Sequence, residues 1–156
     1  MASPLNRMIA DEQYLRQALQ LAQAAEQAGE VPVGAVVVLN GEIIGQGNNR
    51  TIRDNDPTAH AEILALREAA KATNNYRLDG TTLYATLEPC VMCAGALVNA
   101  RVKRLVFGAR DLRFGGVRSK FHLADAAVLN HRIEIVEGVL GADCTELLQL
   151  FFSSRR

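Results

Sequence analysis

Two short stretches of the sequence contain side chains that could hold a metal and carry out acid–base chemistry. Cys90 and Cys93 supply two thiols three residues apart, and His60 and Glu62 supply an imidazole and a carboxylate two residues apart. Two thiolates and one imidazole suit Zn²⁺, and three protein ligands leave one coordination position open for water. A carboxylate that is not itself a ligand can act as the base beside it. We therefore predict a catalytic zinc site with ligands His60, Cys90 and Cys93 and with Glu62 as the catalytic acid–base.

This spacing requires the starts of two helices to face one metal. Residues three apart on a helix lie on one face, so we expect Pro89 at the first helical position and the thiols of Cys90 and Cys93 together in the first turns. Residues two apart on a helix point about 200° from each other. His60 and the carboxylate that follows it can therefore converge only if the metal lies beyond the helix end. The Pro-Thr pair at 57–58 is typical of a helix start.

Parts of this pattern also occur in sites of a different kind. A Cys-x-x-Cys pair alone could be redox-active, which would leave His60 and Glu62 without a role. A closed structural zinc site would need a fourth ligand, for which Cys144, His122 and His131 are the candidates. The complete order, His-x-Glu and then Pro-Cys-x-x-Cys, is far more specific, and it is the signature of zinc-dependent nucleobase deaminases.

The motifs His60–Glu62 and Pro89–Cys93 resemble the zinc-dependent cytidine deaminase superfamily and, more closely, its bacterial tRNA-specific adenosine deaminases of the TadA type. The resemblance implies a three-layer α/β/α sandwich with a mixed, roughly five-stranded sheet, and a single deaminase domain over residues 1–156. It implies one Zn²⁺ per subunit, a homodimer, a tRNA anticodon stem-loop as partner, and hydrolytic deamination of adenosine to inosine at the wobble position. The further segments that carry it are Val31–Val36, Gly47–Arg50, Asp56–Glu62, Asn75–Leu78, Thr86–Gly95, Val106–Asp111 and Phe151–Phe152.

The resemblance also implies which residues bind the substrate. Asn49 matches the asparagine that hydrogen-bonds the purine, and Val33 and Ala61 match positions that line the pocket. Asp111 matches a position near the ribose and backbone of the bound nucleotide. Without the resemblance, core packing is the better interpretation of Val33 and Ala61, and Asp111 fits a turn after the strand 104–108 equally well.

Positive charge is concentrated in two places although the formal net charge is zero. The resemblance implies tRNA contacts at the C-terminal helix, whereas the residues alone fit core packing for the aromatic pair and a complement to the helix dipole for the arginines. The segment 101–120 carries seven basic residues against one acid, and it fits either a solvated face or a rim that binds phosphates of the anticodon stem. The tRNA contacts implied at the C-terminal helix are Phe151, Phe152, Arg155 and Arg156. The seven basic residues of the segment 101–120 are Arg101, Lys103, Arg104, Arg110, Arg113, Arg118 and Lys120.

Length and composition favour one globular domain in a reducing compartment. The chain has 156 residues, of which 49% are hydrophobic, which is enough for a core. Its three cysteines do not suggest a disulfide framework. Residues 1–14 have no apolar stretch typical of a signal peptide, and no apolar run is long enough to span a bilayer. We therefore expect a cytoplasmic protein without a membrane segment.

The order of the expected elements predicts an α/β protein. Helix, hairpin, and then strands alternating with helices indicate a mixed sheet with helices on both faces. A strand followed by a helix places the helix start at the carboxyl edge of the strand, where open α/β sheets keep their sites. We expect helices at 11–28, 58–71, 90–99 and 143–152, strands at 35–39, 42–45, 82–86, 104–108 and 133–135, a turn at Asn40-Gly41, and an ambiguous segment at 119–127 that could form a short helix. We expect the last helix to pack through Leu147, Leu148, Leu150 and Phe151.

Two other functions share part of this pattern. Deaminases of free cytosine, of guanine or of nucleotides use the same zinc signature, and only the similarity along the whole chain and the basic terminal helix separate them from a tRNA enzyme. A structural-zinc module that binds RNA without chemistry would instead hold its zinc with four protein ligands.

Overall fold

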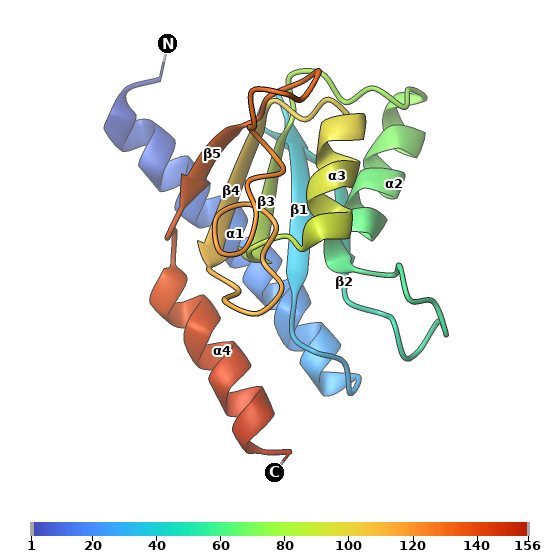
Figure 1. The fold of residues 1–156 in the computed structure, drawn as a ribbon. Coiled ribbons are helices and arrows are strands. Elements are labelled where there is room, and N and C mark those ends of the chain that lie inside the picture. Colours follow the sequence, from blue (N-terminus) through green and yellow to red (C-terminus); the bar gives the residue numbers. More distant parts are fainter. Residues whose placement is uncertain (1, 156) are drawn as a thin grey trace.

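The computed structural model describes residues 2–155, which form a mixed five-stranded sheet between two layers of helices (Figure 1). In chain order the elements are α1 (Pro4–Gln27), β1 (Gly34–Leu39), β2 (Glu42–Asn48), α2 (Ala61–Thr73), β3 (Thr82–Leu87), α3 (Val91–Asn99), β4 (Arg104–Ala109), β5 (Glu134–Glu137) and α4 (Gly141–Ser153). The strand order is β2-β1-β3-β4-β5, with β1 antiparallel to both neighbours and β3, β4 and β5 parallel. Helices α1 and α4 cover one face, and α2 and α3 cover the other. The three-layer α/β/α expectation is confirmed.

Several elements have limits that differ from those expected. Helix α1 begins well before residue 11, because the Ser3 side chain accepts a hydrogen bond from the backbone N–H of Asn6 at 3.1 Å and caps the helix. Helix α2 begins later than residue 58, because the Thr58 N–H and hydroxyl bind the Asp56 carboxylate at 2.8 and 2.7 Å and hold a turn. Strand β2 continues past residue 45 because Gly34 on β1 still pairs with its last residue.

Near the C-terminus the structure decides one open question and corrects one expectation. Residues 119–127 form turns and no helix. Helix α4 buries Phe151 as expected, together with Cys144, but Leu150 is 59% exposed and does not pack against the sheet. The helix therefore turns a narrower apolar face to the sheet than its composition indicated. Within residues 2–155, no helix has both the length and the apolar character needed to cross a membrane.

Each face of the sheet carries its own apolar cluster. Along β4, Leu105 and Phe107 point toward α2 and α3, and Val106 points toward α1, since alternate residues of a strand face opposite sides. Helix α2 lies very close to β2, because a Cβ at Gly47 would stand only 2.6 Å from the carbonyl oxygen of Ala61. This close contact places the first residues of α2 at the edge of the sheet.

A buried ion pair joins α1 to the face of the sheet that it covers. The Asp11 carboxylate accepts hydrogen bonds from both terminal nitrogens of Arg104 on β4, at 2.7 and 2.6 Å. The hydroxyl of Tyr84 on β3 donates to the same carboxylate at 2.8 Å. The Nε of Arg104 donates to Glu134 on β5 at 3.0 Å. One network therefore links α1 with three neighbouring strands.

We expect Asp11→Asn to lower the free energy of unfolding by about 3 kcal/mol, because Arg104 would keep its buried charge without its main partner. Urea denaturation followed by circular dichroism measures the change. Glu12→Gln, on the exposed side of the same helix, is the control and should change the stability by less than about 0.5 kcal/mol. A loss below about 1 kcal/mol for Asp11→Asn would mean that Glu134 alone compensates Arg104.

Candidate metal and substrate site

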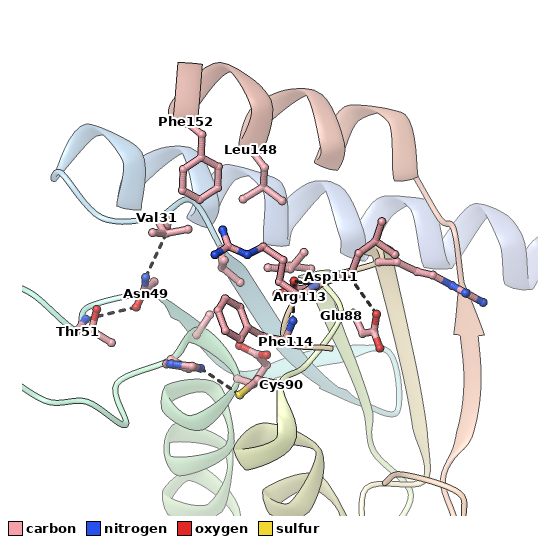
Figure 2. Close-up of a pocket in the computed structure, with 17 residues that line it drawn as sticks. Val31, Asn49, Thr51, Glu88, Cys90, Asp111, Arg113, Phe114, Leu148 and Phe152 are labelled. Atoms are coloured by element: carbon pink, nitrogen blue, oxygen red, sulfur yellow. Dashed lines mark hydrogen bonds between the residues drawn. The ribbon is translucent and has the colours of Figure 1, made fainter. Parts of the chain in front are cut away.

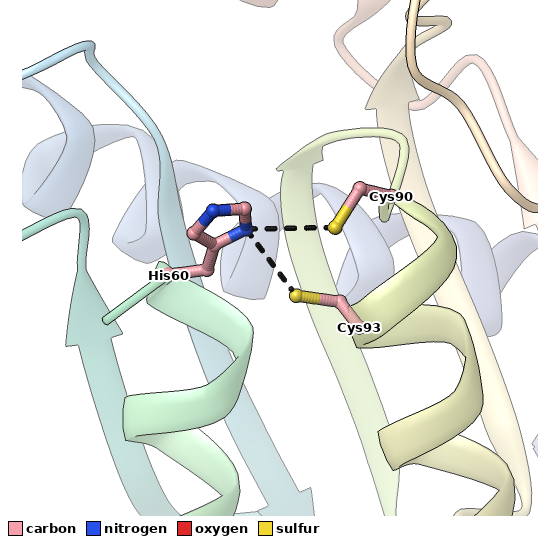
Figure 3. Close-up of side chains that lie close together, drawn as sticks. All are labelled: His60, Cys90 and Cys93. Carbon is pink, nitrogen blue, oxygen red and sulfur yellow. Dashed lines mark hydrogen bonds between the residues drawn. The ribbon is translucent and has the colours of Figure 1, made fainter. Parts of the chain in front are cut away.

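His60, Cys90 and Cys93 converge where α2 and α3 begin (Figure 3). The Nδ1 atom of His60 lies 3.5 Å from the Sγ atom of Cys90 and 3.5 Å from that of Cys93. All three atoms lie within 4.8 Å of one another. Around a tetrahedral zinc ion, with bonds of about 2.3 Å to sulfur and about 2.0 Å to nitrogen, these atoms would be about 3.5 Å apart. The group is therefore positioned to bind a metal, and its donor set and spacing fit zinc.

The convergence arises because His60 and Cys90 are the N-cap residues of their helices. Both have an extended backbone, with φ and ψ of −78° and 153° at His60 and −73° and 179° at Cys90. Cys93 is then the third residue of α3, and the N-cap and third side chains of a helix face each other. The expectation that Pro89 opens the helix is wrong. Pro89 precedes the cap, and its carbonyl accepts a hydrogen bond from Gly116 at 2.8 Å.

Glu62 lies in the first turn of α2, is 4% exposed, and lines a cavity beside the metal-binding group. It is not one of the clustered donor residues. Burial raises the pKa of Glu62 to about 7, so its carboxyl group can take up and release a proton near neutral pH. The hydrogen bond from Cys93, together with that from His60, lowers the pKa of Cys90 to about 4, which favours the thiolate.

No fourth ligand joins the three donors within residues 2–155. Cys144 is buried on α4 beside Gly108, and burial raises its pKa to about 12, as expected for an inert core thiol. Nε2 of His131 lies 2.7 Å from the carbonyl oxygen of Val102, and His122 lies beside Arg118. The structure thus contradicts the closed four-ligand site.

A cavity of about 780 Å³ opens beside the metal-binding group (Figure 2). Its walls come from the start of α2, the segments that flank β1 and β2, the segment after β3, the loop after β4, and one side of α4. Sequence positions far apart therefore meet at the edge of the sheet where β3 and β4 end. Five of the residues for which the resemblance implied a substrate or tRNA contact line the cavity, namely Val33, Asn49, Ala61, Asp111 and Phe152.

Two polar side chains of the cavity are held by local hydrogen bonds. The Asn49 amide donates to the carbonyl of Val31 at 3.4 Å and accepts from the N–H of Thr51 at 3.3 Å. Both bonds are long and weak, so a bound base can compete for this amide. Asp111 accepts from the N–H groups of Arg113 and Phe114, each at 3.1 Å. It thus forms the turn after β4 and lines the cavity as well.

The aromatic pair at the end of α4 divides between core and cavity. Phe151 is buried, so the core-packing interpretation holds for it, whereas the ring of Phe152 is exposed and points into the cavity (Figure 2). The guanidinium of Arg155 lies 4.2 Å from the centre of the Phe151 ring and does not line the cavity. Arg156 lies outside the described residues.

Much of the basic segment 101–120 is paired with acids. Arg104 binds Asp11 and Glu134, Arg110 binds Glu137 at 2.7 Å, and Arg118 binds Asp125 at 2.8 Å. Three of its seven basic side chains therefore have acidic partners. Arg113 and the paired Arg110 line the cavity. A phosphate-binding rim can thus draw on fewer free charges than the sequence indicated.

Two buried carboxylates hold the loops at the cavity, and the motifs in the sequence predicted a role for neither. Glu30 is fully buried and accepts hydrogen bonds from the N–H groups of Ile52 and Arg53, at 3.1 and 2.9 Å, and from the Arg53 side chain at 3.2 Å. Burial alone would raise the pKa of Glu30, but these bonds outweigh it and hold the pKa below its ordinary value. Glu88 plays the same part for the loop after β4. Glu30 directly precedes the segment Val31–Val36 and Glu88 lies within the segment Thr86–Gly95, and this position was the only signal in the sequence.

A mixed sheet that presents an imidazole, two thiols and a buried carboxylate beside an open cavity is the arrangement of a hydrolytic nucleobase deaminase. Residues 9–156 match a family model described as MafB19-like deaminase. The sequence is 54% identical over 147 residues to the tRNA-specific adenosine deaminase of Haemophilus influenzae, covering 94% of this chain and 85% of that protein. The chain therefore belongs to the deaminase family, in the group of tRNA-specific adenosine deaminases.

Solved structures agree with this assignment. A structure from a study of A-to-I editing by tRNA:A34 deaminases matches with a TM-score of 0.84 and 41% identity, over 87% of this chain and 99% of that one. A guanine deaminase from Nitrosomonas europaea matches with a TM-score of 0.80 and 27% identity, over 98% of this chain and 86% of that one. The fold is thus shared by enzymes that act on different substrates.

We expect the stability that Glu30 contributes to depend on pH. Because its pKa is lower in the folded than in the unfolded chain, the contribution is complete above the ordinary pKa of about 4.3 and is lost as the pH falls through the lowered value. Urea denaturation of the wild type and of Glu30→Gln, from about pH 7 to about pH 3, should give a difference that is constant above about pH 5 and shrinks below it. A difference that grows toward acid pH would contradict this account. Glu12→Gln is the matched control.

Proposed function

We propose that the protein is a zinc-dependent adenosine deaminase that converts adenosine to inosine at the wobble position of the tRNA anticodon, with residues 1–156 as one catalytic domain that works in the cytoplasm. The observation that carries the proposal is the metal-binding group and Glu62 at one end of an open cavity, in a chain 54% identical to a tRNA-specific adenosine deaminase. A structural relative was studied for editing at position 34 of tRNA.

His60, Cys90 and Cys93 are the proposed zinc ligands. When bound, zinc supplies water activated for attack on the ring carbon that carries the amino group. Glu62 accepts a proton from the attacking water and delivers it to the adjacent ring nitrogen. It then takes the second proton, from the hydroxyl group now bound to the ring carbon, and transfers it to the amino group, which leaves as ammonia while the carbonyl of inosine forms. Its position in the first turn of α2, outside the donor group but lining the same cavity, supports this role.

The remaining cavity residues bind the nucleotide in this proposal. Asn49 hydrogen-bonds the purine through its weakly held amide, and Val33 and Ala61 contact the ring. Asp111 lies near the ribose. Phe152 at the mouth of the cavity contacts the anticodon loop in this proposal, and Arg155 and Arg156 are proposed as further tRNA contacts. A base in an unpaired loop can be turned out to enter such a cavity at low cost in free energy.

A homodimer is part of the same proposal. Helix α3 has apolar residues on most of its surface, and Val91 at its start is 47% exposed in the single chain. A second copy packed over this part of the molecule would cover it. Sedimentation equilibrium of the protein at micromolar concentration tests the assembly independently of activity.

We expect Glu62→Ala to keep its zinc and to lose at least about a hundredfold in turnover, because the proton transfer is removed while the ligands stay. Zinc content measured by elemental analysis, together with inosine formation, gives both results. Glu68→Ala, exposed on the same helix, should match the wild type. Cys93→Ser should lose both zinc and activity. A zinc-free or fully active Glu62→Ala protein would contradict these roles.

The substrate is tested by offering an anticodon stem-loop and free adenine, guanine and cytosine side by side. We expect ammonia and inosine from the stem-loop only, since the cavity mouth is formed by loops and by α4 rather than closed around a free base. Ammonia only from free bases would favour the second candidate, a free-base deaminase, which the likeness to a guanine deaminase supports. Binding of the stem-loop without turnover would favour an RNA-binding module.

A further inference from the structure

Glu88 is a buried charge whose oxygens are fully used by one loop. It is 2% exposed and lies two residues before Cys90. One carboxylate oxygen accepts from the N–H of Asp111 at 3.0 Å and from the hydroxyl of Ser119. The other accepts three backbone N–H bonds, from Val117 at 3.1 Å, Arg118 at 2.7 Å and Ser119 at 2.9 Å.

These five bonds hold both ends of the loop 110–119, whose first half, Arg110–Phe114, forms one wall of the cavity (Figure 2). The carboxylate occupies the inside of the loop, because a Cβ at Gly115 would overlap it. Val117 is the one apolar side chain of the loop in the core, since Leu112 and Phe114 are exposed. The rest of the loop therefore packs around a charge and not around apolar side chains.

We propose that Glu88 is a positioning residue for substrate binding, which holds the wall formed by Arg110–Phe114 at a set distance from the metal-binding group. It acts through the loop, because its oxygens already accept five hydrogen bonds and are not left for a substrate. The link to the metal-binding group is short, since Pro89 and Cys90 follow directly and Gly116 donates to the Pro89 carbonyl at 2.8 Å. The kinetic part of this proposal rests on the proposed function.

Glutamine is the informative replacement because it keeps the size of the side chain. Its amide has one acceptor oxygen and one NH₂ group that only donates. Whichever way the amide is turned, its NH₂ group faces a backbone N–H, either that of Asp111 or those of 117–119. At least one end of the loop then loses its anchor, while the zinc ligands are unchanged.

The test compares Glu88→Gln with the wild type in the zinc-loaded protein. Hydrogen exchange of the amides at 111 and 117–119 should be faster in the variant, and KM for the anticodon stem-loop should rise about tenfold, with a much smaller change in kcat. Zinc content should be unchanged. Gly115→Ala, which displaces the carboxylate without removing it, should give the same pattern. Glu42→Gln, an exposed acid on β2, is the matched control and should leave every value unchanged.

Each other outcome has a defined meaning. Unchanged KM, with or without faster exchange, would overturn the role in substrate binding, and loss of zinc would show that Glu88 positions Cys90 instead of the loop. If Glu88→Gln does not fold, Ser119→Ala removes one of the five bonds and should shift exchange and KM in the same direction by less. If the wild type acts on a free base and not on the stem-loop, the KM comparison is made with that base. The proposed function would then fail while the role of Glu88 is still decided.

Discussion

The site depends on two helices that begin side by side at one edge of the sheet. His60 and Cys90 are the residues at which the chain changes from extended to helical, and each side chain therefore points past the end of its helix toward the other. The order of the strands makes this possible, since β1 and β3 are neighbours, with α2 and α3 packed together on the same face. Donors thirty residues apart in the sequence thus meet within hydrogen-bond distance.

Around this centre, buried carboxylates fix the loops that apolar packing does not. A loop beside a cavity exposes backbone N–H groups that need acceptors, and a buried carboxylate is costly unless several donors surround it. Glu30 and Glu88 meet both requirements at once, one on each side of the cavity. Asp11 does the same between α1 and the sheet, where its donors are Arg104 and Tyr84. In each of these three cases a buried charge joins segments that are distant in the sequence.

The features that could be predicted from the sequence are those that depend on a short-range pattern of residues. The hairpin at Asn40-Gly41, the mixed sheet and the donors His60, Cys90 and Cys93 follow from residue type and spacing, and the structure brings these donors together. The starts of α2 and α3 were displaced by a few residues, because capping and turn bonds, rather than helix preference, decide where a helix begins.

Hydrogen bonds and ion pairs between residues far apart in the sequence follow no short-range pattern. Nothing in the sequence indicates that the carboxylate oxygens of Glu88 accept hydrogen bonds from residues 111–119. Nor does the sequence indicate that three of the seven basic residues of 101–120 pair with acids elsewhere in the chain. Such pairings depend on which loops the fold brings together. For the same reason, Leu150 could be placed on a packed face by its apolar character alone, although it faces outward.

The residues that line the cavity are synthesised at widely separated times as the chain grows. All donors of the metal-binding group lie between residues 60 and 93, whereas Leu148 and Phe152 complete the wall on the far side. A growing polypeptide emerging from the ribosome therefore possesses the complete donor set well before α4 exists to enclose the cavity. Translation thus supplies every donor of the metal-binding group before it supplies the helix that closes the cavity, so the thiols of Cys90 and Cys93 are made before that cover exists.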